Sequence, residues 1–349
     1  MSEGRSSETR RRRASMREVA DLAHVAISSV SRVLSGHPDV SAEMKVRVLD
    51  AVAQLDYEPD FLAQSLRRGQ TLSVGFVLAD ISNPVMADIV VGAEVVLRNA
   101  GYSLMLMNSE NNVALDSAHI RFFQSRRVDG LILSLSSETH AETLDAIASV
   151  GVPVVVVDRE VEAHLGASAA VNDHAAGMEA AVRHLVELGH RRIALISGSL
   201  EQLPGRERPL GMQRALAAAG PDVESIVLPG SFSRAHGEAA TRQLLARSER
   251  PTAIIAGGNQ LLIGCLAVLQ EAGLVVGRDV SLVTCDDVPL TVLYQPPIAS
   301  ISRDTVELGR VAAELLLERL GEDGGPPRRV VIPTVFRPRA SCAPPNGSG

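Results

Sequence analysis

"MREVADLAHVAISSVSRVLSGHPDVS", residues 16–41, predicts two short amphipathic helices joined by a tight turn. Apolar residues recur at helical spacing in 16–23 and again in 27–34, and the second segment ends at the helix-stop pair Ser35-Gly36. Neither segment is long enough to form a stable helix by itself. Both therefore need a further helix to pack against, and the next segment supplies one.

The residues that flank these segments are typical helix N-caps. Ser15 and Glu18 have the S-x-x-E spacing of a capping box, and Ser41 can cap a third helix. The apolar face of this third helix is formed by Val48, Val52 and Leu55. We therefore predict a helix-turn-helix headpiece over residues 15–58, and we expect the polar segment 1–14 to be a disordered basic tail.

The whole chain has the composition of a soluble globular protein. It has 349 residues, of which 46% are hydrophobic and 21% are charged, and its net charge is −7. No apolar run approaches the roughly 18–20 residues of a membrane helix, and the N-terminus has no secretory signal. Three cysteines without metal-ligand spacing predict reduced thiols. We therefore expect a cytoplasmic, nucleoid-associated protein with no membrane contact, no metal and no cofactor.

Residues 71–340 alternate short apolar runs with stretches of helical periodicity. Runs such as "LSVGFVL", "PVVVV" and "TAIIAG" have the composition of strands buried on both faces, and their alternation with helices predicts parallel sheets. About ten strands are too many for one open sheet, so we expect two lobes with a cleft at the carboxyl ends of their strands. Lobe one is predicted over about 71–160 and 290–320, lobe two over about 161–289 and 321–340, and a disordered tail over 341–349.

These segments resemble the lactose-repressor family of bacterial transcription regulators from about Met16 to Pro338. The headpiece carries "REVADLAHVAISSVSRVL" and "VSAEMKVRVLDAVAQLDYEPDFLAQSLRRGQT". The body carries "VGFVLADISNP", "RRVDGLIL", "GVPVVVVDR", "HLVELGHRRIALISG", "RERPLGMQRAL" and "VSLVTCDDVPL" in the family's order. The resemblance implies an α/β fold, with an all-helical helix-turn-helix headpiece and a two-lobed, periplasmic-binding-protein-like body. It also implies a repressor that binds a palindromic operator as a homodimer, under the control of a small polar effector.

Base contacts are implied for the second helix, which enters the major groove in this family. Ile27, Ser28 and Ser29 occupy its base-reading positions, where Ile27 suits a thymine methyl group and the serines offer short hydrogen bonds. Arg32 can contact a base or a phosphate. In the alternative, the serines are ordinary helix residues. Charge does not decide between the two, because residues 15–69 hold six basic and eight acidic side chains.

The segment "DFLAQSLRRG", residues 60–69, is implied to be the hinge helix of a linker over 59–70. In the family this hinge orders on DNA, and a leucine from each subunit wedges into the central minor groove. Leu66 occupies that position, and Arg67 is placed to contact the DNA backbone. The other implied DNA-contacting residues on the segment are Ala63 and Gln64. In the alternative, Leu66 is a linker residue covered by the core.

The turn before the second helix departs from the family pattern. The family usually has Gly-Val-Ser there, and this chain has His24-Val25-Ala26. His24 must then adopt left-handed backbone angles, and Ala26 lacks the capping hydroxyl, at a cost of about 0.5–2 kcal/mol. We therefore expect a marginally stable headpiece that is fully ordered only on DNA. A phosphate contact is the alternative role for His24.

The resemblance places the effector between the two lobes. The implied contacts are Asp158 after "VVVV", Arg208 as a ligand-gripping arginine and Asp286 as a ligand-binding acid. Each of the three can instead belong to a structural ion pair. The remaining candidates are Val85, Met86, Ile255 and Asn259. Val85 and Met86 replace family aromatics and an acid is missing near Asn259, so a flat ring or a hexose is disfavoured, and the effector is expected among sugar acids, sugar phosphates, polyols and related metabolites.

Two other classes of protein have a similar body. A solute-binding receptor without a regulatory role would need a signal peptide and no headpiece, and both conditions fail. A Rossmann-type enzyme would need G-x-G-x-x-G after the first strand, and neither this motif nor G-x-x-x-x-G-K-[ST] nor G-x-S-x-G is found. We expect no enzyme activity and structural roles for His184 and His190. No leucine heptads follow Arg339, which favours a dimer over a tetramer.

Overall fold

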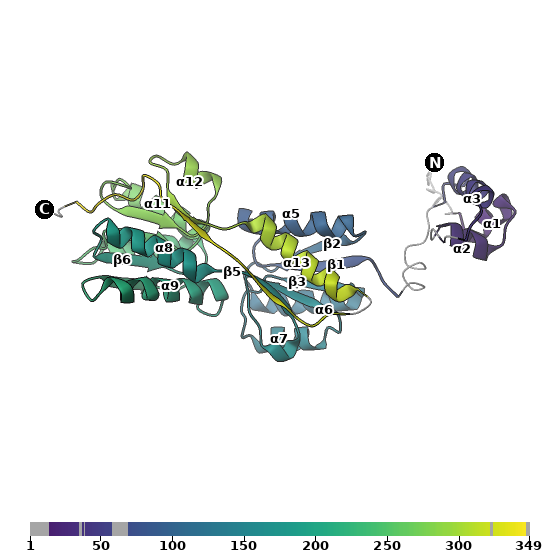
Figure 1. Cartoon of the computed structure of the whole chain (residues 1–349), viewed down its shortest axis with the longest axis horizontal. Coiled ribbons are helices and arrows are strands. Elements are labelled where there is room, and N and C mark those ends of the chain that lie inside the picture. Colours follow the sequence, from purple (N-terminus) through teal and green to yellow (C-terminus); the bar gives the residue numbers. More distant parts are fainter. Residues whose placement is uncertain (1–13, 35–36, 38, 58–68, 322–323, 347–349) are drawn as a thin grey trace, which may run out of the picture. The chain divides into compact units, whose positions relative to one another are not determined.

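The chain folds into two compact units, residues 1–71 and residues 72–349, in a computed structural model. The structure describes residues 14–34, 37, 39–57, 69–321 and 324–346. The first unit is an all-helical headpiece, and the second is an α/β body with two sheets (Figure 1). The predicted fold class is therefore confirmed.

The headpiece packs its helices around one small core. The helices are α1 (Met16–Ala23), α2 (Ile27–Leu34) and α3 (Ala42–Gln54). The buried side chains of the core include Val19, Val30, Val33, Val48 and Tyr57. The predicted capping box forms, because the Ser15 backbone N–H donates to Glu18 Oε2 over 2.7 Å and the Glu18 N–H donates to Ser15 Oγ over 3.3 Å.

The turn between α1 and α2 is tight and unusual in composition. His24 has φ 51° and ψ 50°, the left-handed backbone that its position requires. Ala26 stands directly before α2 and has no side-chain oxygen, whereas Ser41 Oγ accepts the Met44 N–H at the start of α3. Helix α2 therefore begins without the side-chain cap that α1 and α3 have.

Restoring this cap should stabilise α2. In Ala26→Ser the new hydroxyl can accept an N–H of the first turn, which is worth about 0.5–2 kcal/mol. Amide hydrogen exchange over residues 30–34, measured on the full chain, should slow by roughly twofold to thirtyfold. Ala53→Ser, at an exposed position of α3, is the control and should leave exchange in α2 unchanged. Equal exchange in the two variants would contradict the prediction.

The body contains two six-stranded sheets, one in each lobe. The first has the order β11-β5-β4-β3-β1-β2, from the strands β1 (Ser73–Leu78), β2 (Ser103–Asn108), β3 (Gly130–Leu133), β4 (Val154–Val157), β5 (Ser168–Asn172) and β11 (Arg329–Ile332). The second has the order β12-β10-β9-β8-β6-β7, from the strands β6 (Arg192–Ile196), β7 (Glu224–Leu228), β8 (Ala253–Ala256), β9 (Ser281–Thr284), β10 (Ala299–Ser302) and β12 (Val335–Arg337). Among the described strands every pairing is parallel except that of β10 with β12. The predicted parallel sheets are therefore present.

Helices pack on both faces of each sheet (Figure 1). In lobe one the helices are α5 (Pro84–Asn99) and α13 (Thr305–Leu320) on one face, and α6 (Val113–Arg126) and α7 (Ala141–Ser149) on the other. In lobe two they are α10 (Arg234–Leu245) and α11 (Asn259–Glu271) on one face, and α8 (His174–Glu187) and α9 (Leu203–Ala219) on the other. The short elements η1 (Ala163–Leu165) and α12 (Pro289–Leu293) lie in connections. Both sheets are thus buried on both faces, as their Val-rich strands require.

The lobes exchange chain segments at places that differ from the predicted boundaries. Strand β5 pairs with β4 and β11, so residues 168–172 and 329–332 belong to lobe one, not to lobe two. Strand β10 pairs with β9 and β12, so residues 290–302 belong to lobe two. The boundary was misplaced because β4 and β5 are joined through η1 without a crossover helix. The pairing of such strands cannot be predicted from the local sequence pattern.

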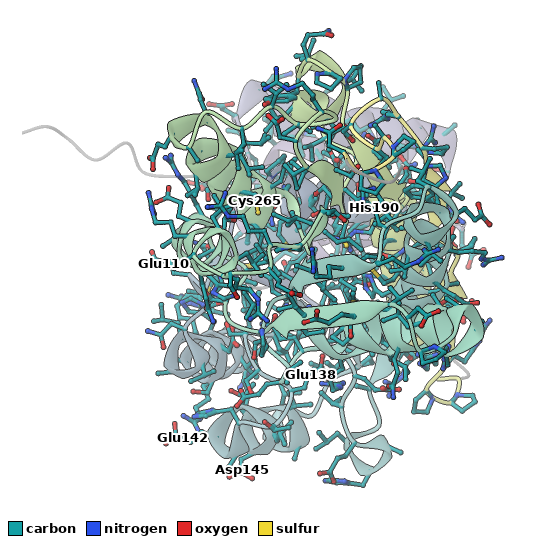
Figure 2. All side chains as sticks on the ribbon, turned by 90° about the vertical axis from the view of Figure 1, so that its left-hand side faces the viewer. Glu110, Glu138, Glu142, Asp145, His190 and Cys265 are labelled. Carbon is teal, nitrogen blue, oxygen red and sulfur yellow. The ribbon has the colours of Figure 1, made fainter. Side chains whose placement is uncertain are left out.

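The C-terminal segment also differs from the expected disordered tail. Ser341 is buried, its hydroxyl donates to Leu282 O over 2.6 Å, and it accepts the Ala299 N–H over 2.7 Å. The carbonyl of Ala343 lies 3.0 Å from Nε2 of the buried His190, which is labelled in Figure 2. Residues 341–346 therefore pack against lobe two. Hydrogen bonds to the backbone hold this segment, which has no apolar periodicity of its own. The contact with Ala343 gives His190 a structural role.

Helices α5 and α13 approach each other closely at glycines. A Cβ atom at Gly309 would lie 1.9 Å from Ile89 O, which is rigid backbone. We therefore expect Gly309→Ala to lower the free energy of unfolding of the body by about 1–3 kcal/mol, because the helices must separate. Urea denaturation measures the loss. Gly325→Ala is the matched control, because no atom lies within 4 Å of its Cβ position, and equal losses in both would contradict this account.

Candidate functional sites

The second headpiece helix exposes the residues that sequence analysis assigned to base contact. The Ile27 side chain is 43% exposed, Ser28 and Arg32 are exposed and Ser29 is half-buried. Val30 and Val33 of the same helix are buried. Exposure leaves these side chains accessible to a partner but does not by itself assign them to base contact, because single exposed apolar residues are common on protein surfaces. The four implied hinge contacts Ala63, Gln64, Leu66 and Arg67 lie outside the described residues.

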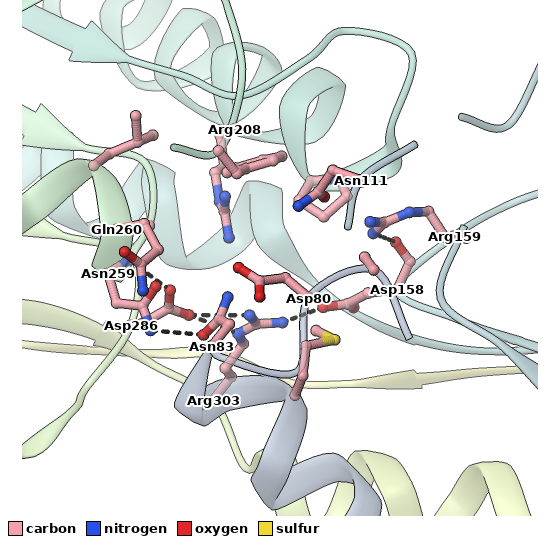
Figure 3. Close-up of a pocket in the computed structure, with 16 residues that line it drawn as sticks. Asp80, Asn83, Asn111, Asp158, Arg159, Arg208, Asn259, Gln260, Asp286 and Arg303 are labelled. Carbon is pink, nitrogen blue, oxygen red and sulfur yellow. Dashed lines mark hydrogen bonds and ion pairs between the residues drawn. The ribbon is translucent and has the colours of Figure 1, made fainter. Parts of the chain in front are cut away.

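A cleft lies between the lobes, at the carboxyl ends of their strands (Figure 3). Its empty volume is about 610 Å³, including open solvent at the mouth. The residues that line the cleft are Ala79, Asp80, Asn83, Met86, Asn111, Asp158, Arg159, Pro204, Arg208, Phe232, Gly258, Asn259, Gln260, Leu261, Asp286 and Arg303.

The cleft contains most of the side chains that the sequence suggested for an effector site. The five that line it are Met86, Asp158, Arg208, Asn259 and Asp286. Val85 and Ile255 do not line it, which corrects their assignment. Val85 is buried in the apolar core under α5, and Ile255 of β8 is buried in the core that β8 shares with α8 and α9. Both are apolar side chains next to polar ones, and they turn into the cores.

Several cleft residues were missed, among them Asp80, Asn111 and Arg303. Asp80 follows β1 by two residues, Asn111 follows β2 and Arg303 follows β10 directly. Their positions after apolar runs were a signal that could have identified them. The sequence holds no comparable signal for Phe232, which enters the cleft from the loop between β7 and α10.

Arg303 forms the centre of the cleft's charge network (Figure 3). Its guanidinium pairs with the Asp158 carboxylate of lobe one, and its Nε donates to Asp286 Oδ1 of lobe two over 3.0 Å. All three side chains are buried, and that of Arg303 is only 8% exposed. For both aspartates the structure therefore shows the ion pair that was the alternative to ligand binding.

His174 and the backbone complete the surroundings of Asp158. Asp158 Oδ1 accepts the Asn172 N–H over 2.9 Å and lies 3.2 Å from His174 Nε2. Burial by itself would raise the pKa of Asp158, but His174 and Arg303 outweigh it and hold that pKa well below the usual range. Burial lowers the pKa of His174, so the imidazole acts as a neutral hydrogen-bond donor at neutral pH. Asp158 is therefore ionised and fully partnered.

Arg208 has different surroundings. Its Nη1 donates to Gly257 O over 2.6 Å, and its guanidinium lies over the Phe232 ring, 5.4 Å from the centroid. Among the described residues no carboxylate lies within ion-pair distance of it. The side chain is buried and points into the cleft (Figure 3). Arg208 is therefore positioned by neutral groups.

Further hydrogen bonds join the lobes around the cleft. Asn259 Nδ2 donates to Asn83 Oδ1 over 2.8 Å. Glu138, which follows β3 and is labelled in Figure 2, accepts the Leu203 N–H at the start of α9 and pairs with Arg206 over 2.6 Å. Burial raises the pKa of Glu138, against the opposing effect of Arg206. The lobes are thus joined by polar contacts around the cleft.

No described helix has the length and apolar character needed to cross a membrane. Within the same residues, no group of three or more His, Cys, Asp or Glu side chains is placed to hold a metal ion.

Removal of Arg303 should be costly. In Arg303→Met two buried carboxylates lose their cation, so we expect the free energy of unfolding of the body to fall by about 3–5 kcal/mol in urea denaturation at pH 7. Arg310→Met is the control, because Arg310 also pairs with two carboxylates, Glu307 and Glu314, but on the surface. A similar loss in both variants would show that the buried network has no special weight.

Each of the two units matches a known protein family. Residues 15–60 match the family model "Bacterial regulatory proteins, lacI family", and residues 182–342 match the model "Periplasmic binding protein-like domain". The HTH-type transcriptional repressor PurR of Haemophilus influenzae (strain PittEE) is 33% identical over 310 residues, which cover 88% of this chain and 91% of that protein. The ribose operon repressor of Escherichia coli (strain K12) is 32% identical over 332 residues, covering 94% and 100%.

The structural comparison agrees with these matches. The lac repressor, in a crystal structure of its dimer bound to operator and the anti-inducer ONPF, superposes with a TM-score of 0.84 at 26% identity and covers 95% of this chain and 100% of that one. The implied family is therefore confirmed by sequence and by fold. The chain belongs to the lacI family of bacterial regulatory proteins, and it is a transcriptional regulator and not an enzyme.

Proposed function

We propose that this protein represses transcription by binding a palindromic operator as a homodimer, and that a small polar effector in the cleft between the lobes controls the binding. The observation that carries the proposal is the cleft itself. Its polar lining comes from both lobes, and the contacts that hold the lobes together, at Arg303 and between Asn83 and Asn259, pass through it. A ligand there makes different contacts in open and closed arrangements, which is the condition for coupling.

The headpiece supports the DNA-binding half of the proposal. Ile27, Ser28 and Ser29 lie at the N-terminal end of α2, the end that meets base edges when such a helix enters the major groove. Arg32 is exposed one turn later and is the proposed backbone or base contact. One headpiece offers few contacts, so two headpieces on one duplex gain affinity because the second contact is effectively intramolecular.

Exposed apolar side chains on the body support the dimer. Val91 and Val95 on α5 are 56% and 41% exposed, and Leu293 on α12 is 76% exposed. These are the faces after "NPVM" and near "TVLYQPP", where a dimer contact is expected. Exposed apolar residues gathered on a helix face are typical of an interface between chains. The lac repressor, in the structure named above, is a dimer bound to operator.

The proposal can be tested with the purified full chain. DNA selected by the protein from a random duplex pool should converge on a two-fold symmetric sequence. Its affinity should fall steeply as salt rises, because phosphate contacts release counterions. Sedimentation should show a dimer at micromolar concentration. A monomer, or a pool that never converges, would reject the proposal and favour a solute-binding receptor without a regulatory role.

A substitution on α2 tests the base-contact assignment. Ser28→Ala should weaken binding to the selected sequence by roughly fivefold to 100-fold, since one base contact is worth about 1–3 kcal/mol. Binding to random duplex should change little, because phosphate contacts remain. Fluorescence anisotropy at fixed salt measures both affinities. Ser125→Ala, on the exposed surface of α6, serves as control. Equal losses on both duplexes would show that Ser28 does not read a base.

A further inference from the structure

The charges that line the cleft are not equally available to a ligand. Three aspartates and three arginines line it. Asp158 and Asp286 are both bound to Arg303, which also donates from Nη1 to Asn172 Oδ1 over 3.3 Å. Each of these two acids has a further protein donor, because the Asn259 N–H donates to Asp286 Oδ2 over 2.9 Å and the Asn172 N–H donates to Asp158 Oδ1 over 2.9 Å. Arg303 therefore neutralises the two buried acids from within the protein.

The second arginine, Arg159, is also engaged by the protein. Its Nε donates to Leu135 O, and its Nη1 donates to Asp158 O over 2.7 Å. Its side chain is buried, and the carboxylates of Glu138 and Asp116 act on its charge. Arg159 therefore lines the cleft but uses two of its nitrogens for backbone carbonyls, and Figure 3 shows its contact with Asp158.

Arg208 and Asp80 remain as the charged groups that face the ligand space. Arg208 uses one guanidinium nitrogen for Gly257 O, and the other two form no ion pair or hydrogen bond within the described part of the chain. Asp80 Oδ1 accepts the Ser82 N–H and hydroxyl over 2.9 and 2.7 Å, which turns part of this carboxylate toward its own loop. Around them stand amide side chains, including Asn83, Asn111 and Gln260.

We propose that the effector is a small hydroxylated anion whose acid group is bound by Arg208. This inference rests on the proposed function and names the chemical class of the ligand at that site. A buried guanidinium without a carboxylate partner is best satisfied by a carboxylate or phosphate, which can accept two parallel hydrogen bonds. The hydroxyl groups then meet Asp80 and the amides, which accept and donate hydrogen bonds.

The guanidinium of Arg303 explains why a neutral sugar suits the cleft less well than an anion does. With Asp158 and Asp286 already occupied by Arg303, a neutral polyol would find only Asp80 as an ionised acceptor for its hydroxyls. It would also leave the Arg208 charge buried without a counter-charge, which is unfavourable. The Arg208 guanidinium covers one face of the Phe232 ring, so a flat ligand ring cannot stack on that face.

Paired probes test the inference on the full-length wild-type protein. Thermal unfolding is followed with gluconate against glucose, with ribose 5-phosphate against ribose, and with inorganic phosphate, all at ionic strength matched by sodium chloride. At least one acid should bind roughly tenfold or more tightly than its neutral partner, the scale of one charge-assisted bidentate contact. Preference for gluconate assigns a carboxylate to Arg208, and preference for the phosphate-bearing probes assigns a phosphate. Equal binding within both pairs, or no shift with any anion, would overturn the inference.

Variants locate the acid group. Arg208→Gln should reduce the preference for the acid to less than about twofold, and Arg208→Lys should keep part of it, because the charge remains without the fork. Arg214→Gln is the matched control, because Arg214 lies on the same helix α9 but is exposed and outside the cleft. An undiminished preference in a folded Arg208→Gln protein would also overturn the assignment.

Operator binding separates this inference from the proposed function. A protein that selects a symmetric duplex but is indifferent to every anion refutes the effector class alone. A protein that prefers the acid probes but binds no DNA sequence refutes the regulatory function alone. The anion that binds should in addition change the operator affinity of the wild type and of Arg214→Gln, and it should leave that of Arg208→Gln unchanged.

Discussion

The contact of Arg303 with Asp158 and Asp286 is the constraint on which the arrangement of the body depends. The two acids stand at the ends of strands in different lobes, and Arg303 stands where the chain crosses from β10 to α13. Burial of these charges is unfavourable unless each is paired. In this arrangement all three charges are paired, and each lobe supplies one of the two acids.

The direction of the strands and the places where the chain passes between the lobes bring these three charges together. In each lobe the parallel strands direct their carboxyl ends toward the cleft, so polar residues that follow apolar runs gather there without any local signal to join them. The chain passes between lobes beside this edge, and the close packing of α5 on α13 at Gly92 and Gly309 holds the outer layer of lobe one. The two lobes are joined by polar contacts. Lobes joined in this way can move apart as rigid bodies more readily than lobes joined by a packed apolar interface.

The chain has the fold of its family, and two of its details are distinctive, one in the headpiece and one in the cleft. In the headpiece, His24 takes the left-handed turn position and Ala26 leaves α2 without a side-chain cap. In the cleft, Phe232 is the aromatic ring among the lining residues, and it already contacts a guanidinium. The missing cap lowers the intrinsic stability of α2, and the guanidinium covers one face of the Phe232 ring.

The helices and strands could be predicted from the sequence, because caps, apolar periodicity and turn residues are local signals. It predicted the three headpiece helices, the left-handed His24, the parallel sheets and five of the seven cleft positions that were suggested. Tertiary structure alone decided which lobe receives β5 and β10, that Ser341 is buried, that Val85 and Ile255 turn into the cores, and that Arg303 joins Asp158 to Asp286. Those outcomes depend on pairings between residues far apart in the chain, such as Arg303 and Asp158 at a separation of 145 positions, and no local pattern encodes such a pairing.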